Sequence, residues 1–132
     1  VPLPESPARY YTAAWNDYMG GRYDIAVEGF RDVVQKFPNT PDAGRAQFYI
    51  GEAYYQQRNK CQQAIPEYQK VIDLYRESEL VPDAYLMQGV CYQDLNQTAN
   101  ARRMFELVRD RYPNSTQATQ ATQKLRGMGV LR

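Results

Sequence analysis

The sequence predicts an all-α fold: a solenoid of three helix pairs, followed by a C-terminal capping helix. First, Ala26, Phe30 and Pro38 recur with the same spacing as Ala101, Phe105 and Pro113. A period of about 37 to 38 residues is typical of stacked helix pairs. Second, the apolar residues follow helical spacing, and no segment shows sustained strand alternation.

The first helix pair is well delimited. Ser6 is a suitable cap and Pro7 suits a first helical turn, so we predict a helix from residue 7 to Met19, ended by Gly20 and Gly21. A second helix spans about 24–37 and ends at Pro38. We expect its core stripe to comprise Ile25, Ala26, Val27, Phe30, Val33 and Val34.

The second pair is the least regular. Thr40 with Pro41 opens a helix that extends to about Gln57, and its partner covers roughly 61–76. Pro66 lies inside that partner helix. Because proline lacks the N–H group that a helix interior needs, we expect it to shift the helix start or to kink the helix.

The third pair and the end complete the domain. Pro82 opens a helix to about Leu95, and Thr98 is expected to cap one that ends near Arg111. The segment 115–126 is thinly apolar and suits a capping helix, since the last repeat of a stack must present one hydrated side. The predicted organisation is a linker tail (1–6), a domain (7–126) with repeats at about 7–40, 41–78 and 82–115, and a tail (127–132).

Composition argues against several functions. The net charge is +1, with basic and acidic residues interleaved, so nothing favours nucleic acid or an anionic membrane surface. No apolar run is long enough for membrane insertion. Histidine is absent and no glycine-rich loop follows a strand, so we expect a non-enzymatic chain without cofactor or metal.

Cys61 and Cys91 are the only thiols. Three interpretations remain open: a disulfide, two buried free thiols, or a redox site. Counting outward from the loop near Glu79 places Cys91 opposite about Glu67, more than a turn from Cys61. That register disfavours a bridge, since bridged Cα atoms lie within about 7 Å of each other.

The repeated residues resemble a known family. Gly21, Tyr23, Ala26, Phe30 and Pro38 are similar to a tetratricopeptide repeat. So are two further sets: Gly51, Ala53, Tyr54, Tyr55, Ala64 and Tyr68, and Tyr85, Gly89, Tyr92, Ala101, Phe105 and Pro113. The resemblance implies a right-handed solenoid that binds proteins.

A finer resemblance is to the C-terminal domain of the periplasmic Tol-Pal accessory proteins, the YbgF or CpoB family. It rests on the segments 21–38, 46–55 and 111–115 and on the proline-bearing stretch before the first repeat. It implies a periplasmic location, TolA as partner, a link to peptidoglycan synthesis at division, and a homo-oligomer formed through an upstream coiled coil or a groove contact. The alternatives are a BamD-like outer-membrane assembly scaffold and a regulatory domain of a cell-wall enzyme.

The resemblance also implies where a partner binds, because the first helix of each pair lines the concave groove. The inward positions are Tyr11, Trp15, Tyr18, Met19, Arg45, Phe48, Glu52, Tyr55, Gln56, Asp83, Leu86, Val90, Gln93 and Asp94. Trp15 and Phe48 suit core and groove equally, whereas Tyr55 suits the groove. Tyr11, Trp15 and Met19 replace the Lys and Asn residues that clamp a terminal carboxylate. We therefore expect a helix or an extended segment as guest.

Overall fold

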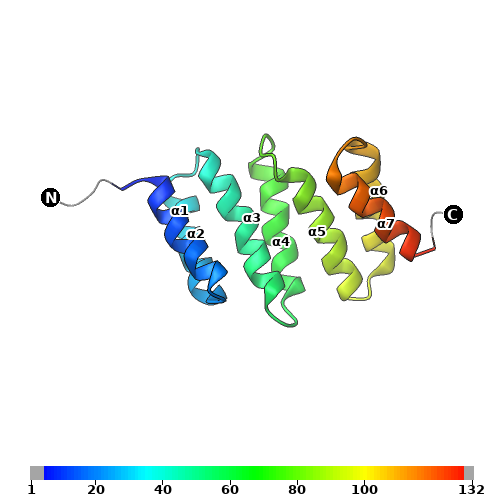
Figure 1. The fold of residues 1–132 in the computed structure, drawn as a ribbon, viewed down its shortest axis with the longest axis horizontal. Coiled ribbons are helices and arrows are strands. Elements are labelled where there is room, and N and C mark those ends of the chain that lie inside the picture. Colours follow the sequence, from blue (N-terminus) through cyan, green and yellow to red (C-terminus); the bar gives the residue numbers. More distant parts are fainter. Residues whose placement is uncertain (1–4, 130–132) are drawn as a thin grey trace.

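The computed structural model describes residues 5–129, and this part of the chain consists of helices joined by short turns. The three pairs are α1 (Pro7–Met19) with α2 (Tyr23–Lys36), α3 (Pro41–Gln56) with α4 (Cys61–Leu74), and α5 (Val81–Asp94) with α6 (Thr98–Arg111). They are followed by α7 (Thr116–Gly127). Consecutive helices pack side by side along the long axis (Figure 1). The all-α solenoid expected from the sequence is confirmed.

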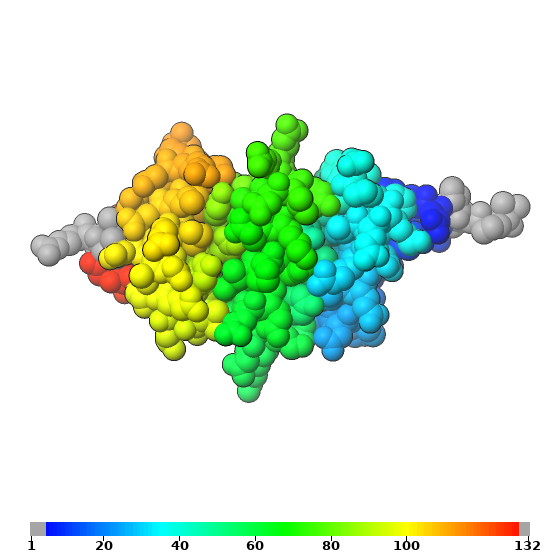
Figure 2. Space-filling view, turned by 180° about the vertical axis from the view of Figure 1, so that it is seen from behind, coloured from blue at the N-terminus to red at the C-terminus, as the bar shows by residue number. Residues whose placement is uncertain are grey.

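The helices form two layers. Helices α1, α3, α5 and α7 lie in front in Figure 1, and we call this surface the odd-helix face. Seen from behind, α2, α4 and α6 form the opposite surface, the even-helix face (Figure 2). Direct contacts join α1 to α3 and α5 to α7. The odd-helix face is thus built from the first helix of each pair and the last helix.

The helix starts follow local capping chemistry. The side chains of Ser6, Thr40 and Ser115 each accept a hydrogen bond from the backbone N–H three residues later. Thr98, however, is not a cap but the first residue of α6, and Gln97 before it makes no capping bond. Helix α7 includes Gly127, which the sequence analysis assigned to the tail; residues 1–4 and 130–132 of the two predicted tails lie outside the described residues.

Pro66 leaves α4 continuous from Cys61 to Leu74, and the helix start is not shifted. The residue that loses its helical hydrogen-bond donor is Gln62, four positions earlier. Gln62 and Pro66 are both exposed. Because both belong to the solvent side of α4, water can satisfy the freed carbonyl.

In the second and third pairs, the two helices meet where a glycine faces a ring. A Cβ added at Gly51 would lie 2.6 Å from Cε1 of Tyr68, and one at Gly89 would lie 2.6 Å from Cε1 of Phe105. Both rings are fully buried. The absence of a side chain on the first helix is what admits the ring of the second.

One residue of the expected stripe in α2 is not in the core. Ala26, Val27, Phe30 and Val33 are buried, but Ile25 is 52% exposed. Successive residues of a helix are rotated by about 100° around its axis. Ile25 is therefore rotated by one such step from Ala26 and by two from Val27, which places it outside the buried stripe.

A buried carboxylate ties the first two pairs together. Glu67 is only 4% exposed, and its carboxylate lies 3.1 Å from Arg31 Nη1 and 3.2 Å from Lys70 Nζ. Gln47 Nε2 donates to the Glu67 backbone carbonyl at 3.0 Å, and Arg31 Nη2 donates to the Tyr54 hydroxyl. Helices α2, α3 and α4 are thus joined at one point.

The register between α4 and α5 differs from the one counted on the sequence. Cys61 and Cys91 are buried free thiols in one core cluster, and they are close enough for each to perturb the pKa of the other. Gln88 Nε2 donates to the Ile65 carbonyl at 3.3 Å, so Cys91 lies closer to the start of α4 than the count indicated. The expected separation of more than a turn was wrong.

Candidate protein-binding face

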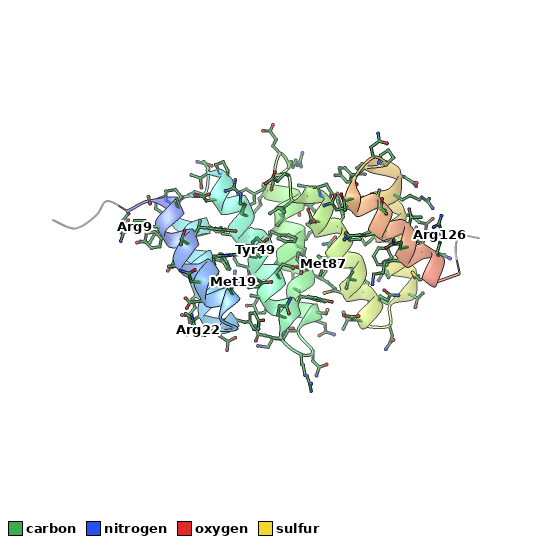
Figure 3. All side chains as sticks on the ribbon, viewed as in Figure 1. Arg9, Met19, Arg22, Tyr49, Met87 and Arg126 are labelled. Carbon is green, nitrogen blue, oxygen red and sulfur yellow. The ribbon has the colours of Figure 1, made fainter. Side chains whose placement is uncertain are left out.

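A row of aromatic side chains joins α1 to α3. Tyr11, Trp15 and Tyr18 follow one another on α1, with the rings of Tyr11 and Trp15 6.3 Å apart and those of Trp15 and Tyr18 5.5 Å apart. Tyr49 of α3 is labelled in Figure 3. Its ring meets that of Trp15 edge-on at 4.9 Å and that of Tyr18 at 5.5 Å. All four side chains remain partly exposed. We call these four residues the aromatic row.

The spacing of the residues produces this row. Positions 11, 15 and 18 lie four and three residues apart, which puts them on one side of α1. Positions 45, 49 and 52 repeat that spacing on α3. Tyr49 is absent from the inward positions that the repeat resemblance implies, which include Phe48 instead; the spacing from Arg45 to Glu52 is the sequence signal that indicates Tyr49.

The carboxylate of Glu52, on α3, is fixed by a hydrogen bond from a buried tyrosine of α4. The Tyr68 hydroxyl donates to Glu52 Oε1 at 2.5 Å, and Tyr68 itself is fully buried. Burial raises the pKa of Glu52 above the ordinary value; the Tyr68 hydrogen bond opposes this shift and Asp83 adds to it. Burial, with the negative charge of Glu52 as the next cause, raises the pKa of Tyr18 to about 12.

A second carboxylate comes from α5. Asp83 Oδ1 accepts a hydrogen bond of 3.0 Å from Gln117 of α7. Burial raises its pKa, against the effect of this hydrogen bond. Tyr49 has a raised pKa caused first by burial and then by the charges of Glu52 and Asp83. The negative charges of Glu52 and Asp83 therefore both influence the Tyr49 hydroxyl on the odd-helix face.

Beyond Asp83, the face continues into a hollow between α5 and α7. The hollow is lined by Leu86, Met87, Val90, Gln120, Gln123 and Lys124. Met87 is partly exposed on α5 (Figure 3). The apolar side chains that line the hollow come from α5, and the polar ones come from α7. Polar side chains suit α7 because it is the helix that ends the stack.

The residues expected to line the groove are distributed unevenly. Phe48 and Leu86 are only 5% and 7% exposed and belong to core clusters. Phe48 packs on the Tyr68 ring at 5.6 Å, which assigns it to the core, whereas Trp15 stays partly exposed in the aromatic row. Because Phe48 and Leu86 are buried, they can support a bound guest only from the layer beneath the surface.

The remaining expected residues reach the surface. Met19 is 65% exposed, and Gln56 and Asp94 are exposed as well. Arg45 is paired with Asp42 at 2.8 Å. Tyr55, Val90 and Gln93 are partly buried. Tyr55 lies near the end of α3, beside a second hollow that includes Cys61 and Asp94.

The described part of the chain contains neither a metal-binding cluster nor a membrane-spanning helix. No group of three His, Cys, Asp or Glu side chains between residues 5 and 129 is placed to hold a metal ion. None of the helices in that range combines the length and apolar character needed to cross a membrane.

Family comparison gives a consistent match over the chain. One family model, described as tetratricopeptide repeat, matches residues 45–78 and 83–115. A second tetratricopeptide repeat model matches residues 11–60. Together they cover all three helix pairs.

Two similar proteins are bacterial. The chain is 28% identical over 113 residues to the outer membrane protein assembly factor BamD of Caulobacter vibrioides, covering 80% of this chain and 37% of that protein. It is 23% identical over 95 residues to the serine/threonine-protein kinase PknD of Protochlamydia amoebophila, covering 70% of this chain and 10% of the kinase. The chain thus spans well under half of either relative.

Solved structures share the fold. The first repeat domain of Spaghetti (RPAP3), bound to the HSP90 peptide SRMEEVD, has a TM-score of 0.74 at 20% identity, covering 93% of this chain and 90% of that one. The first repeat domain of human RPAP3 has a TM-score of 0.71, also at 20% identity, with coverages of 93% and 89%. At this identity the likeness establishes the architecture alone.

Proposed function

Since the chain belongs to the tetratricopeptide repeat family, we propose that it is a protein-binding module without catalytic activity and that its odd-helix face receives the partner. The observation that carries this proposal is the aromatic row. Three tyrosines and a tryptophan are left partly exposed side by side. Such rings offer a large contact area with a polar edge at low entropic cost, which is the composition of interaction surfaces.

We place the module in the periplasm and propose the Tol-Pal system as its context. The partner is then TolA, and the module helps to coordinate outer-membrane constriction with peptidoglycan synthesis at cell division. Support comes from the resemblance of segments 21–38, 46–55 and 111–115 to the Tol-Pal accessory proteins.

A second candidate is a scaffold for outer-membrane protein assembly. It is favoured by the similarity to BamD, which extends over 80% of this chain. Both candidates concern the cell envelope, and both use the chain for protein binding. They differ in the partner, so an experiment that identifies the partner separates them.

Photo-cross-linking from Met19 identifies the partner directly. Met19 is 65% exposed at the end of α1, next to Tyr18, so a photoreactive residue there reports on the odd-helix face without disturbing the core. A matched probe at Leu74, which is 67% exposed on α4, reports on the opposite layer. A TolA adduct from position 19 supports the Tol-Pal candidate, and an adduct with outer-membrane assembly proteins supports the second.

Calorimetric titration with the soluble periplasmic part of TolA completes the test. We expect saturable binding that weakens when Tyr18 or Tyr55 is replaced by Ala, with Leu74→Ala as the matched control. Binding unaffected by both tyrosine substitutions would move the contact to another surface. Adducts from position 74 alone would have the same meaning.

A further inference from the structure

The charges of the first three odd-numbered helices differ from those of the whole chain. The net charge of the chain is +1. Helices α1, α3 and α5 nevertheless carry five carboxylates and only two guanidinium groups. The carboxylates are Asp17, Asp42, Glu52, Asp83 and Asp94, and the guanidinium groups are Arg9 and Arg45. These three helices, which contain the aromatic row, are therefore acidic, whereas α7 of the same face carries Lys124 and Arg126.

Three of these carboxylates lack a cationic partner among the described residues: Glu52, Asp83 and Asp94, of which Asp94 is exposed. Asp17 is paired with Arg22, and Asp42 with Arg45. Among the described residues, Glu52 and Asp83 accept hydrogen bonds from Tyr68 and Gln117, but neither lies within ion-pair distance of a lysine or arginine. Both are partly buried, and burial of a carboxylate without a counter-charge is unfavourable.

The aromatic row provides the other half of a cation site. Glu52 lies three residues beyond Tyr49 on the same side of α3, and the charges of Glu52 and Asp83 both raise the pKa of Tyr49. A lysine or arginine side chain is attracted by the face of an aromatic ring and by a carboxylate together, and both attractions strengthen when water is excluded. The arrangement is complementary to a cation and repels an anion.

From this complementarity we propose that the odd-helix face binds a basic peptide segment, one of whose lysine or arginine side chains lies between the aromatic row and the carboxylates of Glu52 and Asp83. The proposal rests on the proposed function, because it presumes that this face is the one used. It specifies the guest further: a segment whose positive charge meets α3 and α5. Negatively charged peptides are excluded from this position by repulsion.

A random peptide library displayed on phage tests the chemistry of the guest. The library is selected in parallel on the wild-type chain, on Glu52→Gln with Asp83→Asn, and on Asp32→Asn, a control that removes one carboxylate from the other layer. Asp32 is exposed on α2, in the other layer. We expect Lys and Arg to be enriched on the wild type and on the control, and the enrichment to disappear on the double variant.

Affinity measurements on the selected peptides complete the test. We expect each single variant, Glu52→Gln or Asp83→Asn, to weaken a selected basic peptide about tenfold or more. Asp32→Asn should leave the affinity unchanged, and added salt should weaken wild-type binding. Circular dichroism of each variant verifies that it is folded.

The outcomes separate this inference from the proposed function. Selection of neutral or acidic peptides would overturn the basic guest but leave the face in use if Tyr18→Ala abolished their binding. Equal loss of affinity in each single variant and in Asp32→Asn would also overturn it, because the attraction would then depend on overall charge. A wild-type chain that selected no peptide at all, and that gave no adduct from position 19, would overturn both.

Discussion

The methyl group of Ala14 in α1 occupies the space that a side chain at Gly29 in α2 would need. A Cβ added at Gly29 would lie 2.9 Å from the Ala14 Cβ. In the next two pairs the residue equivalent to Ala14 is Gly51 or Gly89, and there the ring of the second helix fills the space. The first pair thus achieves the same close approach with the glycine on the other helix.

This relationship predicts a rescue. Gly29→Ala should lower stability by up to about 2 kcal/mol, because overpacking outweighs the gain in helix propensity. Adding Ala14→Gly exchanges the two residues and should restore most of the loss. Urea unfolding of the two single variants and the double variant measures this. A double variant less stable than both single variants would contradict the packing.

Phe105 should be indispensable for the third pair. Its side chain is fully buried against Gly89 and within the cluster that holds α7. We expect Phe105→Ala to cost about 3 to 5 kcal/mol, because the cavity it leaves cannot collapse completely. Leu74→Ala, at a 67% exposed position, is the control and should change little. Thermal unfolding of both variants provides the comparison.

Loss of the Glu67 carboxylate should weaken the junction of the first two pairs. Its partners Arg31 and Lys70 keep 38% and 48% of their side chains exposed, so each can recover solvation when the carboxylate is removed. We therefore expect Glu67→Gln to cost about 1 to 3 kcal/mol. A double-mutant cycle with Arg31→Met isolates the pairwise interaction, and a coupling near zero would show that the contact is not stabilising.

Stability should depend on pH through Glu52. Because burial raises its pKa in the folded state, the folded chain holds this proton more tightly than the unfolded chain. Ionisation therefore costs stability as pH rises from the ordinary carboxyl range through the raised value, and the cost persists above it. We expect Glu52→Gln to be more stable than the wild type at neutral pH. Urea unfolding across pH should show this advantage disappearing in acid; a constant difference at every pH would contradict it.

Both thiols should react slowly while the chain is folded. Burial raises the pKa of Cys61 and of Cys91, and the thiolate is the reactive form. We expect iodoacetamide to modify neither residue quickly at neutral pH, and both to react once the chain is unfolded in urea. Mass spectrometry of timed samples follows the reaction. Rapid labelling of Cys91, which is fully buried, would show that α4 and α5 separate readily.

Features set by neighbouring residues could be predicted from the sequence. The caps at Ser6, Thr40 and Ser115 depend on a side chain and a backbone N–H three residues apart, so the helix starts followed directly. Thr98 shows the limit of that rule. A capping residue type does not act as a cap when the chain enters the helix one position earlier, at Gln97.

Features set by the register between helices could not be predicted in the same way. The proximity of Cys61 and Cys91 depends on how far α5 slides along α4, which the Gln88 contact to Ile65 reveals. The contacts of Tyr49 with Trp15 and Tyr18 likewise depend on how α1 meets α3, although the spacing of positions 45, 49 and 52 indicates the side of α3 on which Tyr49 lies. The partners of Glu52 and Asp83 come from α4 and α7, distant in the sequence.

The contacts of Glu67 imply that the helices of the solenoid differ in their stability against local unfolding. In a stack where each repeat touches only its neighbours, local stability reflects the strength of the nearest junctions. Helices α2, α3 and α4 share a buried ionic junction, whereas α7 is held by Ala118, Ala121 and Leu125. We therefore expect amide hydrogens of α7 to exchange with solvent first and those of α2 to α4 last. A partner bound to α3 would contact a helix of the segment that stays closed longest, while α7 opens and closes at the far end of the stack.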